Sequence, residues 1–302
     1  MKRKPGKNNT PVQKQLSATH RFFQKLGYKD EEQLRFVLVH DAQNNYYQRY
    51  SSNSNDNNAY NRMPVIPLYK PFHLIEQQVP FITFYSTNGQ PVHLFGQNAR
   101  GYAIFMEVNY RQSRQSSFQD IRAHFIDVDL NKASTITDTK EQALEKAKSL
   151  KASKSESIAS VSITRTPNSR YLLLAERTKS RIEQLKKTYL NRHRSSIKDA
   201  MIVETKNGFH MYWPIQDGSL DKFEPIQKAL VNKFNSDPRI TNLSRAMRVP
   251  GFYHMKDPSD PFMVKVKQWG RSQPFSQNEL VSSLQLNVGA GAQRTQRSRL
   301  IM

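Results

Sequence analysis

The chain has 302 residues, enough for one large domain or two small ones with a buried core. Its 46 Lys and Arg residues outnumber 25 Asp and Glu residues, and the formal charge of +21 favours a polyanionic partner, nucleic acid ahead of an acidic membrane surface. The absence of cysteine excludes disulfides, thiolate zinc sites and cysteine nucleophiles, and no apolar run reaches the ~18 residues of a membrane-spanning helix. No apolar segment follows the basic N-terminus, so we expect no secretory signal and a cytoplasmic location.

The N-terminal part is predicted to form a helix, a strand and a polar linker. Apolar residues recur at helical spacing between Val12 and Leu26, and Gly27 is typical of a helix C-terminus. Leu34–Val39 has the composition of a strand, whereas the Asn-rich run Asn44–Asn61 is too polar to pack. The predicted division of the chain is a basic N-terminal segment with its linker (1–62), a main domain (63–286) and a basic, disordered tail (287–302).

Strand and helix patterns alternate through the rest of the chain, which predicts an α/β or α+β fold around a mixed sheet. The predicted strands are Pro80–Tyr85, Tyr102–Val108, Ala123–Leu130, Ala159–Arg165 and Phe262–Trp269. The predicted helices are Glu141–Leu150, most of the basic run Tyr171–Lys198, Leu220–Asn235 and Gln277–Leu284. Asn207-Gly208, between two β-rich runs, predicts a two-residue hairpin turn in which Thr205 faces His210 and Val203 faces Tyr212.

Two carboxylates stand out within an otherwise apolar strand. Asp127 and Asp129 are two residues apart in Phe125–Leu130, so they project from the same side of the strand, roughly 6–7 Å apart. Two like charges on one face of a buried strand are costly unless something neutralises them, and one or two divalent cations usually do so. The alternative is a pair of solvated carboxylates on a half-exposed strand.

Further along the chain lie other candidates for a phosphate and metal site. Asp237, at a helix-to-turn break, is the preferred third carboxylate, and Asp257 is its rival. His210 could donate to a phosphate, although a lone strand histidine is more often a satisfied core residue. Three cations flank a Pro-Gly turn and suit phosphate binding, unless they form a solvated face: Arg245, Arg248 and Lys256. The basic run Tyr171–Lys198 is open to the same two interpretations.

Several other chemistries are excluded by missing motifs. The sequence contains no G-x-x-x-x-G-K-[ST] loop of ATPases and helicases and no His-x-His pair of rolling-circle nicking enzymes. It also lacks the G-x-S-x-G and H-E-x-x-H motifs of serine hydrolases and zinc proteases.

Taken together, the ordered motifs resemble those of the archaeo-eukaryotic primase superfamily, and in particular the RepB-like replication primases of plasmids and phages. The resemblance covers about 64–284. The motifs that carry it are Phe125-Ile126-Asp127-Val128-Asp129, Gly208-Phe209-His210, the Asp237 region and the run Leu243–Lys256. This chain departs from the family pattern at Asn242, where the family often has an acid, and it has no fused helicase.

The resemblance implies a sheet of the RNA-recognition-motif type packed against a second α/β unit, with an active-site cleft between them. It implies that Asp127, Asp129 and the third acid, Asp237, would hold Mg²⁺ or Mn²⁺, as two ions. The residues expected to bind nucleotide or template are His210, Arg245, Arg248, Lys256 and Lys206.

By this resemblance the chain would be a primase or primase-polymerase of a mobile genetic element. It would join nucleoside triphosphates into short primers on single-stranded DNA, beside a separate replicative helicase. Two alternatives stay open: a non-catalytic replication initiator or DNA-binding module on the same fold, and a metal-dependent nuclease that uses the same carboxylates.

Overall fold

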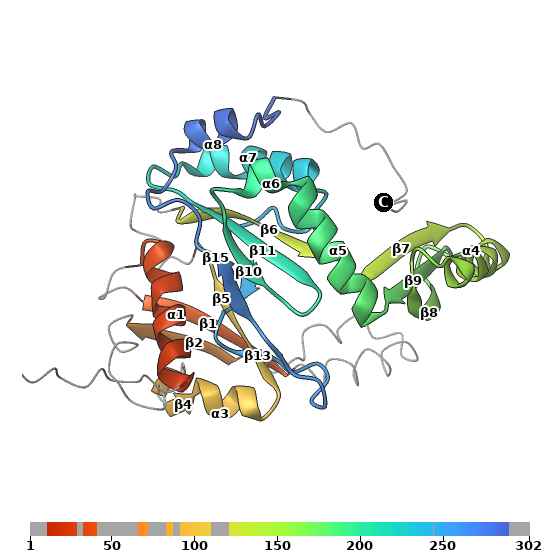
Figure 1. The fold of residues 1–302 in the computed structure, drawn as a ribbon, viewed down its shortest axis with the longest axis horizontal. Coiled ribbons are helices and arrows are strands. Elements are labelled where there is room, and N and C mark those ends of the chain that lie inside the picture. Colours follow the sequence, from red (N-terminus) through yellow and green to blue (C-terminus); the bar gives the residue numbers. More distant parts are fainter. Residues whose placement is uncertain are drawn as a thin grey trace, which may run out of the picture.

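Two antiparallel sheets share one hydrophobic core, and a smaller three-stranded unit projects to one side (Figure 1). The computed structural model describes residues 11–28, 33–40, 66–71, 83–86, 91–109, 121–243 and 245–289. The predicted linker Asn44–Asn61 and most of the predicted tail lie outside these residues. Among the described helices, none has both the length and the apolar character that crossing a bilayer requires.

The first sheet has six strands, and every pairing in it is antiparallel. Its order is β12 (Ala246–Arg248), β5 (Tyr102–Glu107), β1 (Gln33–His40), β2 (Ile66–Pro71), β3 (Thr83–Ser86) and β4 (Pro91–His93). Two helices accompany it: α1 (Pro11–Lys25) and α3 (Leu94–Ala99). Residues from both sides of the predicted boundary at residue 62 therefore pair in one sheet.

The second sheet has four strands, again antiparallel. Its order is β15 (Lys265–Gln268), β10 (Met201–Glu204), β11 (Gly208–Pro214) and β6 (Ala123–Asp129), so β6 is an edge strand. The helices beside it are α5 (Lys179–Arg192), α6 (Arg194–Ile197), α7 (Leu220–Phe234) and α8 (Gln277–Ser283). A short ribbon, β13 (Tyr253–His254) with β14 (Phe262–Met263), precedes β15.

The two faces of β6 serve different cores because side chains alternate along a strand. Ile126 and Val128 pack with α7 and α8 in one cluster, in which Leu230 is fully buried. Phe125 faces the opposite way, into the core shared with the first sheet and α1. There the ring of Phe22 meets that of Tyr212 edge-on, at 5.5 Å between centroids. Alternation places Asp127 and Asp129 on the same face as Phe125, at the C-terminal end of the strand.

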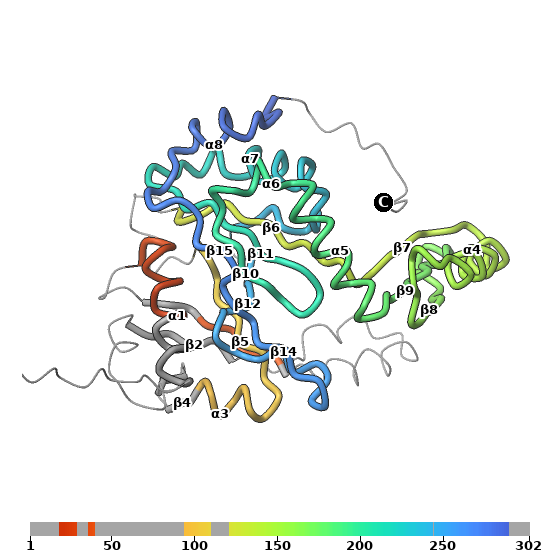
Figure 2. The backbone as a smooth tube through the Cα atoms, in the orientation of Figure 1, coloured from red at the N-terminus to blue at the C-terminus, as the bar shows by residue number. Residues whose placement is uncertain are grey.

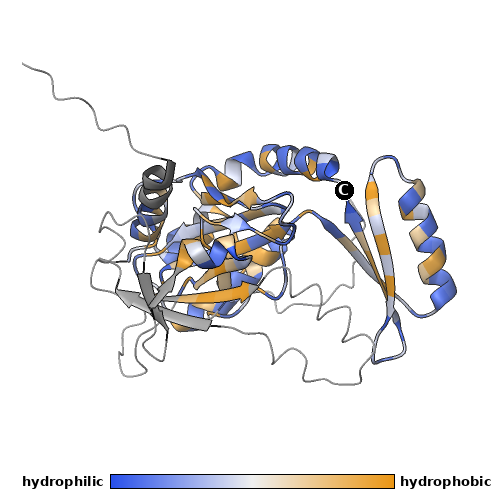
Figure 3. Cartoon of the chain, turned by 90° about the horizontal axis from the view of Figure 1, so that it is seen from below, coloured by the Kyte–Doolittle hydropathy of each residue, from blue (hydrophilic) through white to orange (hydrophobic). Residues whose placement is uncertain are grey.

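Directly after β6 the chain forms a separate three-stranded unit. Its antiparallel sheet has the order β7 (Lys132–Thr137), β9 (Tyr171–Arg177) and β8 (Ile158–Arg165), and α4 (Lys140–Ala152) covers one face. Leu173 and Ala175 of β9 pack against Ala147 and Leu150 of α4 in a core of their own. Figure 2 shows the backbone entering this unit from β6 and returning from β9 into α5, and Figure 3 shows α4 along its outer side.

The structure corrects three predictions from the sequence. All described strand pairs in the sheets are antiparallel, so the predicted mixed sheet is wrong, although the predicted α/β or α+β class, with both helices and strands, is confirmed. The run Tyr171–Lys198, predicted to be mostly helical, begins with strand β9, and its helical part starts only at Lys179. In the hairpin, Val203 pairs with His210 and Met201 with Tyr212, a shift of two residues from the predicted pairing.

Candidate active site

The pairing of β6 with β11 brings the acidic strand and the predicted histidine together. Asp127 lies directly opposite His210, and Asp129 lies opposite Gly208. The Nε2 atom of His210 is 3.7 Å from Oδ1 of Asp127, too long for a hydrogen bond. On its other side, Nδ1 of His210 is 3.4 Å from the hydroxyl of Tyr212. The imidazole thus stands between a carboxylate and a phenol on one face of the sheet.

Gly208 allows this close pairing. A Cβ atom at this position would collide with the carbonyl oxygen of Val128 on β6. The predicted turn at Asn207-Gly208 requires a positive φ angle at both residues, and neither has one, so this turn does not form. The loop is instead closed by the N–H of Thr205, which donates to the carbonyl of Gly208 over 3.0 Å. The glycine is needed for the contact with β6 rather than for the turn.

The charge on Asp127 is unfavourable in this setting. Burial, and then the neighbouring charges of Asp129 and Asp237, raise the pKa of Asp127 to about 7, against opposing effects of Arg245 and Arg248. Asp129 lies at the exposed strand end, but the protein atoms around it still raise its pKa, while the N–H of Asn131 opposes the shift with a 2.8 Å hydrogen bond. The energetic cost that the sequence predicts for a pair of carboxylates is therefore found at Asp127, whose charged form is disfavoured by burial and by its neighbours.

His210 is neutral at physiological pH. Its burial, followed by the positive charges of Arg248 and Arg245, lowers the pKa of its imidazole to about 3. A neutral imidazole forms no ion pair with Asp127. It retains one N–H group that can donate to an incoming oxygen atom.

Of the two candidates for a third carboxylate, Asp237 lies at the site. Helix α7 ends at Phe234 and is capped by Asn235 in a left-handed conformation. The chain then returns to β6, where the N–H of Asp237 donates to the carbonyl of Asp127 over 3.0 Å. Its carboxylate accepts hydrogen bonds from the Arg239 side chain, the shortest of 2.9 Å. Partial burial alone would raise the pKa of Asp237, but the hydrogen bonds and charge of Arg239 outweigh it and hold the pKa below its usual value.

The rival carboxylate, Asp257, lies elsewhere. It is exposed and accepts hydrogen bonds from the N–H and the hydroxyl of Ser259, which lower its pKa. It is not among the charges that shift the pKa of Asp127 or Asp129. The structure therefore favours Asp237 over Asp257 as the third acid.

The predicted cations divide into those near the carboxylates and one that is not. Arg245 has a nitrogen 3.8 Å from Oδ2 of Asp237, and Arg248 lies over the ring of Phe105 on the first sheet, 4.7 Å from its centroid. Lys256 is close enough to Asp129 to oppose the rise in its pKa. Lys206 instead donates to the backbone carbonyl of Asp260 over 2.8 Å and pairs with its carboxylate at 3.3 Å.

Some residues at the site were not assigned a role from the sequence. Tyr212 could have been found from strand alternation, since it is two residues beyond His210 on the same face. Lys132 opposes the rise in the pKa of Asp129, and His254 contributes to the lowered pKa of His210. Arg239 binds Asp237 and follows it by two residues, but nothing in the sequence pattern indicated this contact.

The carboxylate oxygens of the site fit a divalent cation in part. Nowhere in the described part of the chain do three or more His, Cys, Asp or Glu side chains form a ready metal cluster. Asp127 and Asp129 nonetheless offer two oxygen donors on one strand face, and the cost of the charge on Asp127 is what a bound cation would remove. Asp237 has its oxygens engaged by Arg239 and would have to exchange this partner to join them.

Comparison with known proteins identifies a family. The model of the RepB DNA-primase N-terminal domain matches residues 106–291, more than half of the chain. No curated protein matches the chain. Similar solved structures include primase RepB', with 12% identity and a TM-score of 0.42, where the alignment covers 90% of this chain and 62% of that one. The chain thus spans less than two thirds of that primase.

Two further structures are similar to the chain. The catalytic domain of primase RepB' in complex with initiator DNA has 12% identity and a TM-score of 0.41, with coverage of 90% of this chain and 94% of that one. The AEP domain of the cyanophage S-2L primase-polymerase has 8% identity and a TM-score of 0.44, with coverage of 89% and 97%.

Proposed function

The chain belongs to the family of RepB DNA-primase N-terminal domains, and on this premise we propose that it is an active primase or primase-polymerase of a mobile genetic element. It would bind single-stranded DNA as template and join nucleoside triphosphates into a short primer, with release of pyrophosphate. A separate replicative helicase would supply the single strand. The formal charge of +21 suits a nucleic-acid partner.

One observation supports this function above all others: the β6–β11 register sets Asp127 opposite His210, with Asp237 hydrogen-bonded to the same strand. Nucleotidyl transfer needs carboxylates that hold metal ions and donors that hold phosphate oxygens, and this register supplies both kinds on one sheet face. Asp127 and Asp129 would hold Mg²⁺ or Mn²⁺, with Asp237 as the third ligand of a two-ion site. Such ions, when bound, offset the charge of the reacting phosphate and activate the attacking hydroxyl.

The other residues would bind and orient the nucleotide. His210, being neutral, would donate its N–H to a phosphate oxygen without adding charge. Arg245 and Arg248 would oppose the negative charge of the triphosphate, and Lys256 would contact nucleotide or template beside Asp129. Lys206, which is paired with Asp260, would have to leave that partner to contact a nucleotide.

The decisive experiment measures primer synthesis on single-stranded DNA with nucleoside triphosphates and Mn²⁺. We expect Asp127→Asn and Asp129→Asn each to reduce synthesis on the order of a thousandfold, because each removes a charged metal ligand. Affinity for single-stranded DNA should be retained, since neither change removes a cation. Asp138→Asn, at an exposed carboxylate of the three-stranded unit, is the matched control and should synthesise primers normally.

Full primer synthesis by the Asp127→Asn/Asp129→Asn double variant would show that the site assignment is wrong. Binding of single-stranded DNA without any synthesis by the wild-type protein would instead favour a non-catalytic initiator. Cleavage of a labelled single strand with Mn²⁺ and no nucleotides would favour a nuclease on the same carboxylates.

A further inference from the structure

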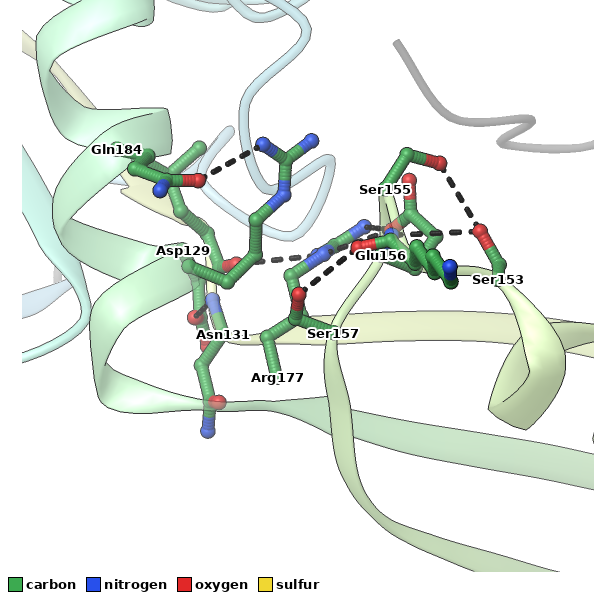
Figure 4. A network of polar contacts seen from close by, with 11 residues as sticks. Asp129, Asn131, Ser153, Ser155, Glu156, Ser157, Arg177 and Gln184 are labelled. Carbon is green, nitrogen blue, oxygen red and sulfur yellow. Dashed lines mark hydrogen bonds and ion pairs between the residues drawn. The ribbon is translucent and has the colours of Figure 1, made fainter.

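A buried ion pair lies within the three-stranded unit, next to its junction with β6. Two N–H groups of the Arg177 guanidinium donate to one carboxylate oxygen of Glu156, over 3.0 and 2.8 Å (Figure 4). The exposed fractions of these two side chains are 10% and 3%. Arg177 is the last residue of β9, and Glu156 lies in the loop between α4 and β8. The pair therefore sits where the unit meets the rest of the molecule.

Arg177 also binds the two residues that follow the acidic strand. Its remaining side-chain nitrogen, Nη1, donates to the carbonyl of Leu130 over 3.0 Å, and its backbone N–H donates to the carbonyl of Asn131 over 2.9 Å. On the opposite side, the N–H of Leu130 donates to the carbonyl of Asn207 in the hairpin loop over 2.8 Å. Leu130 and Asn131 are thus fixed between the hairpin and Arg177.

This fixed segment in turn orients Asp129. The N–H of Asn131 donates to Oδ1 of Asp129 over 2.8 Å, and Figure 4 shows the two side by side near Arg177. Asp129 is otherwise exposed at the end of its strand, where a carboxylate would rotate freely. The peptide group that restrains Asp129 joins Leu130 to Asn131, and its carbonyl accepts the hydrogen bond from Nη1 of Arg177. A chain of contacts therefore runs from Glu156 through Arg177 and Asn131 to Asp129.

We propose that Arg177, oriented by Glu156, is a positioning residue that holds the Asp129 carboxylate in place for metal binding. This inference rests on the proposed function, because it assumes that Asp129 is a metal ligand. The ion pair itself does not require Arg177 to reach outside the three-stranded unit. The hydrogen bond to Leu130 does so, and it connects the pair to the acidic strand.

Three variants separate positioning from mere stability. Arg177→Lys keeps the charge opposite Glu156 but cannot bind Glu156 and Leu130 with the same fork of donors. Glu156→Gln leaves Arg177 without its charged partner. The exchanged double variant Glu156→Arg/Arg177→Glu restores an ion pair, yet a glutamate at position 177 cannot donate to the Leu130 carbonyl. Arg170→Gln, which breaks the exposed pair of Arg170 with Asp138, is the matched control.

The experiment measures Mn²⁺ binding to the full chain by electron paramagnetic resonance, without DNA or nucleotide, together with thermal unfolding and amide hydrogen exchange. We expect Arg177→Lys and Glu156→Gln to weaken Mn²⁺ binding about tenfold and to speed exchange at Leu130 and Asn131. The exchanged variant should regain thermal stability but not Mn²⁺ affinity. Arg170→Gln should match the wild type in all three measurements.

Mn²⁺ affinity within about twofold of wild type in both single variants would overturn the inference, as would recovery of Mn²⁺ affinity in the exchanged variant. If the wild-type protein makes primers while these results are found, the proposed function stands and only the positioning role falls. If the wild-type protein binds no Mn²⁺ and makes no primer, both fall together.

Discussion

At the scale of single residues, folding disfavours the charged form of the Asp127 carboxyl. Its side chain is 29% exposed, and burial together with the charges of Asp129 and Asp237 raises its pKa. His210, 3.7 Å away, provides no counter-charge, because burial and two arginines lower the pKa of its imidazole and keep it neutral. Such a residue costs stability in the absence of a ligand, which is typical of functional sites.

We therefore predict that Asp127→Asn stabilises the metal-free protein. With EDTA at pH 8, the free energy of unfolding should rise by about 2 kcal/mol, because an amide carries no charge to bury or repel. Since the folded-state pKa of about 7 lies above the ordinary value of 3.8, protonation below pH 7 progressively relieves the wild type. The gain should shrink as the pH falls from 7 and be lost near pH 4.

Denaturant unfolding at several pH values measures this difference, with Asp138→Asn as the exposed control. Equal stability of Asp127→Asn and wild type at pH 8 would show that the charge on Asp127 does not destabilise the folded protein. Addition of Mn²⁺ should stabilise the wild type and not the variant, because ligands stabilise the state that binds them.

At the scale of elements, the site depends on how closely β11 approaches β6. The pairing sets His210 opposite Asp127, and a glycine at position 208 is what lets the two backbones meet there. A side chain at this position would push the strands apart next to Asp129.

Gly208→Ala should therefore destabilise the protein by about 2–4 kcal/mol and abolish primer synthesis, because the added methyl group has no space against Val128. Urea unfolding and the primer assay measure the two effects. Gly289→Ala is the control, since a Cβ at Gly289 would meet open space. Normal stability of Gly208→Ala would show that the β6–β11 contact can relax.

Local sequence patterns predicted several of these elements well and others not at all. The apolar spacing of Leu220–Asn235 and the β-branched run Ala123–Leu130 predict α7 and β6 nearly to the residue. The Asn-Gly pair located the hairpin but not its register, because Gly208 serves a close approach and not a turn. Strand β9 contains leucine, alanine and glutamate, good helix formers, and its pairing with β7 and β8 overrides their preference.

The placement of the site residues was predictable where it depends on alternation along one strand, as for Asp127 and Asp129. It was not predictable where it depends on the folded conformation of loops and turns. The pairing of Lys206 with Asp260 and that of Asp237 with Arg239 follow from the folded positions of short turns, which carry no periodic signal. The roles of all the site residues in binding metal or nucleotide, those of Lys206 and Asp237 included, remain predictions.

At the scale of the whole molecule, the order of the motifs in the sequence predicted the family, whereas the arrangement of the strands in the sheets was harder to predict. The family match confirms the resemblance to RepB-like primases, and the α/β class is confirmed. The six-stranded sheet was not foreseen, because it joins β12 to β5 and β1 across more than 130 residues of chain. Strand β12 has three residues, too few for a detectable period.

The charge of the whole chain predicts binding that depends steeply on salt. If about six phosphates of a single strand are neutralised, affinity should fall about three-hundredfold between 50 and 200 mM salt, at a slope near −0.7 per phosphate. Arg245→Gln and Lys256→Gln should each reduce the slope by about 0.7 if each side chain contacts one phosphate.

Fluorescence anisotropy with a labelled oligonucleotide gives these slopes. An oligonucleotide with uncharged methylphosphonate linkages is the control, and its weak binding should hardly respond to salt. A slope near zero for the natural strand would show that the positive charge of the chain does not contact the backbone.

The way in which the three-stranded unit is attached has a consequence for how such proteins diversify. The chain leaves the edge strand at Asn131 and returns at Arg177, and a hydrogen bond joins these two residues directly. The segment between them is therefore attached to the rest of the chain at two neighbouring residues, and it has its own hydrophobic core. A segment with this topology can be shortened, enlarged or exchanged between relatives without breaking a strand pairing of the main sheets. The sheet edge that carries Asp127 and Asp129 is thus also a place where a different segment could be inserted, provided that the inserted segment keeps an arginine where the chain returns.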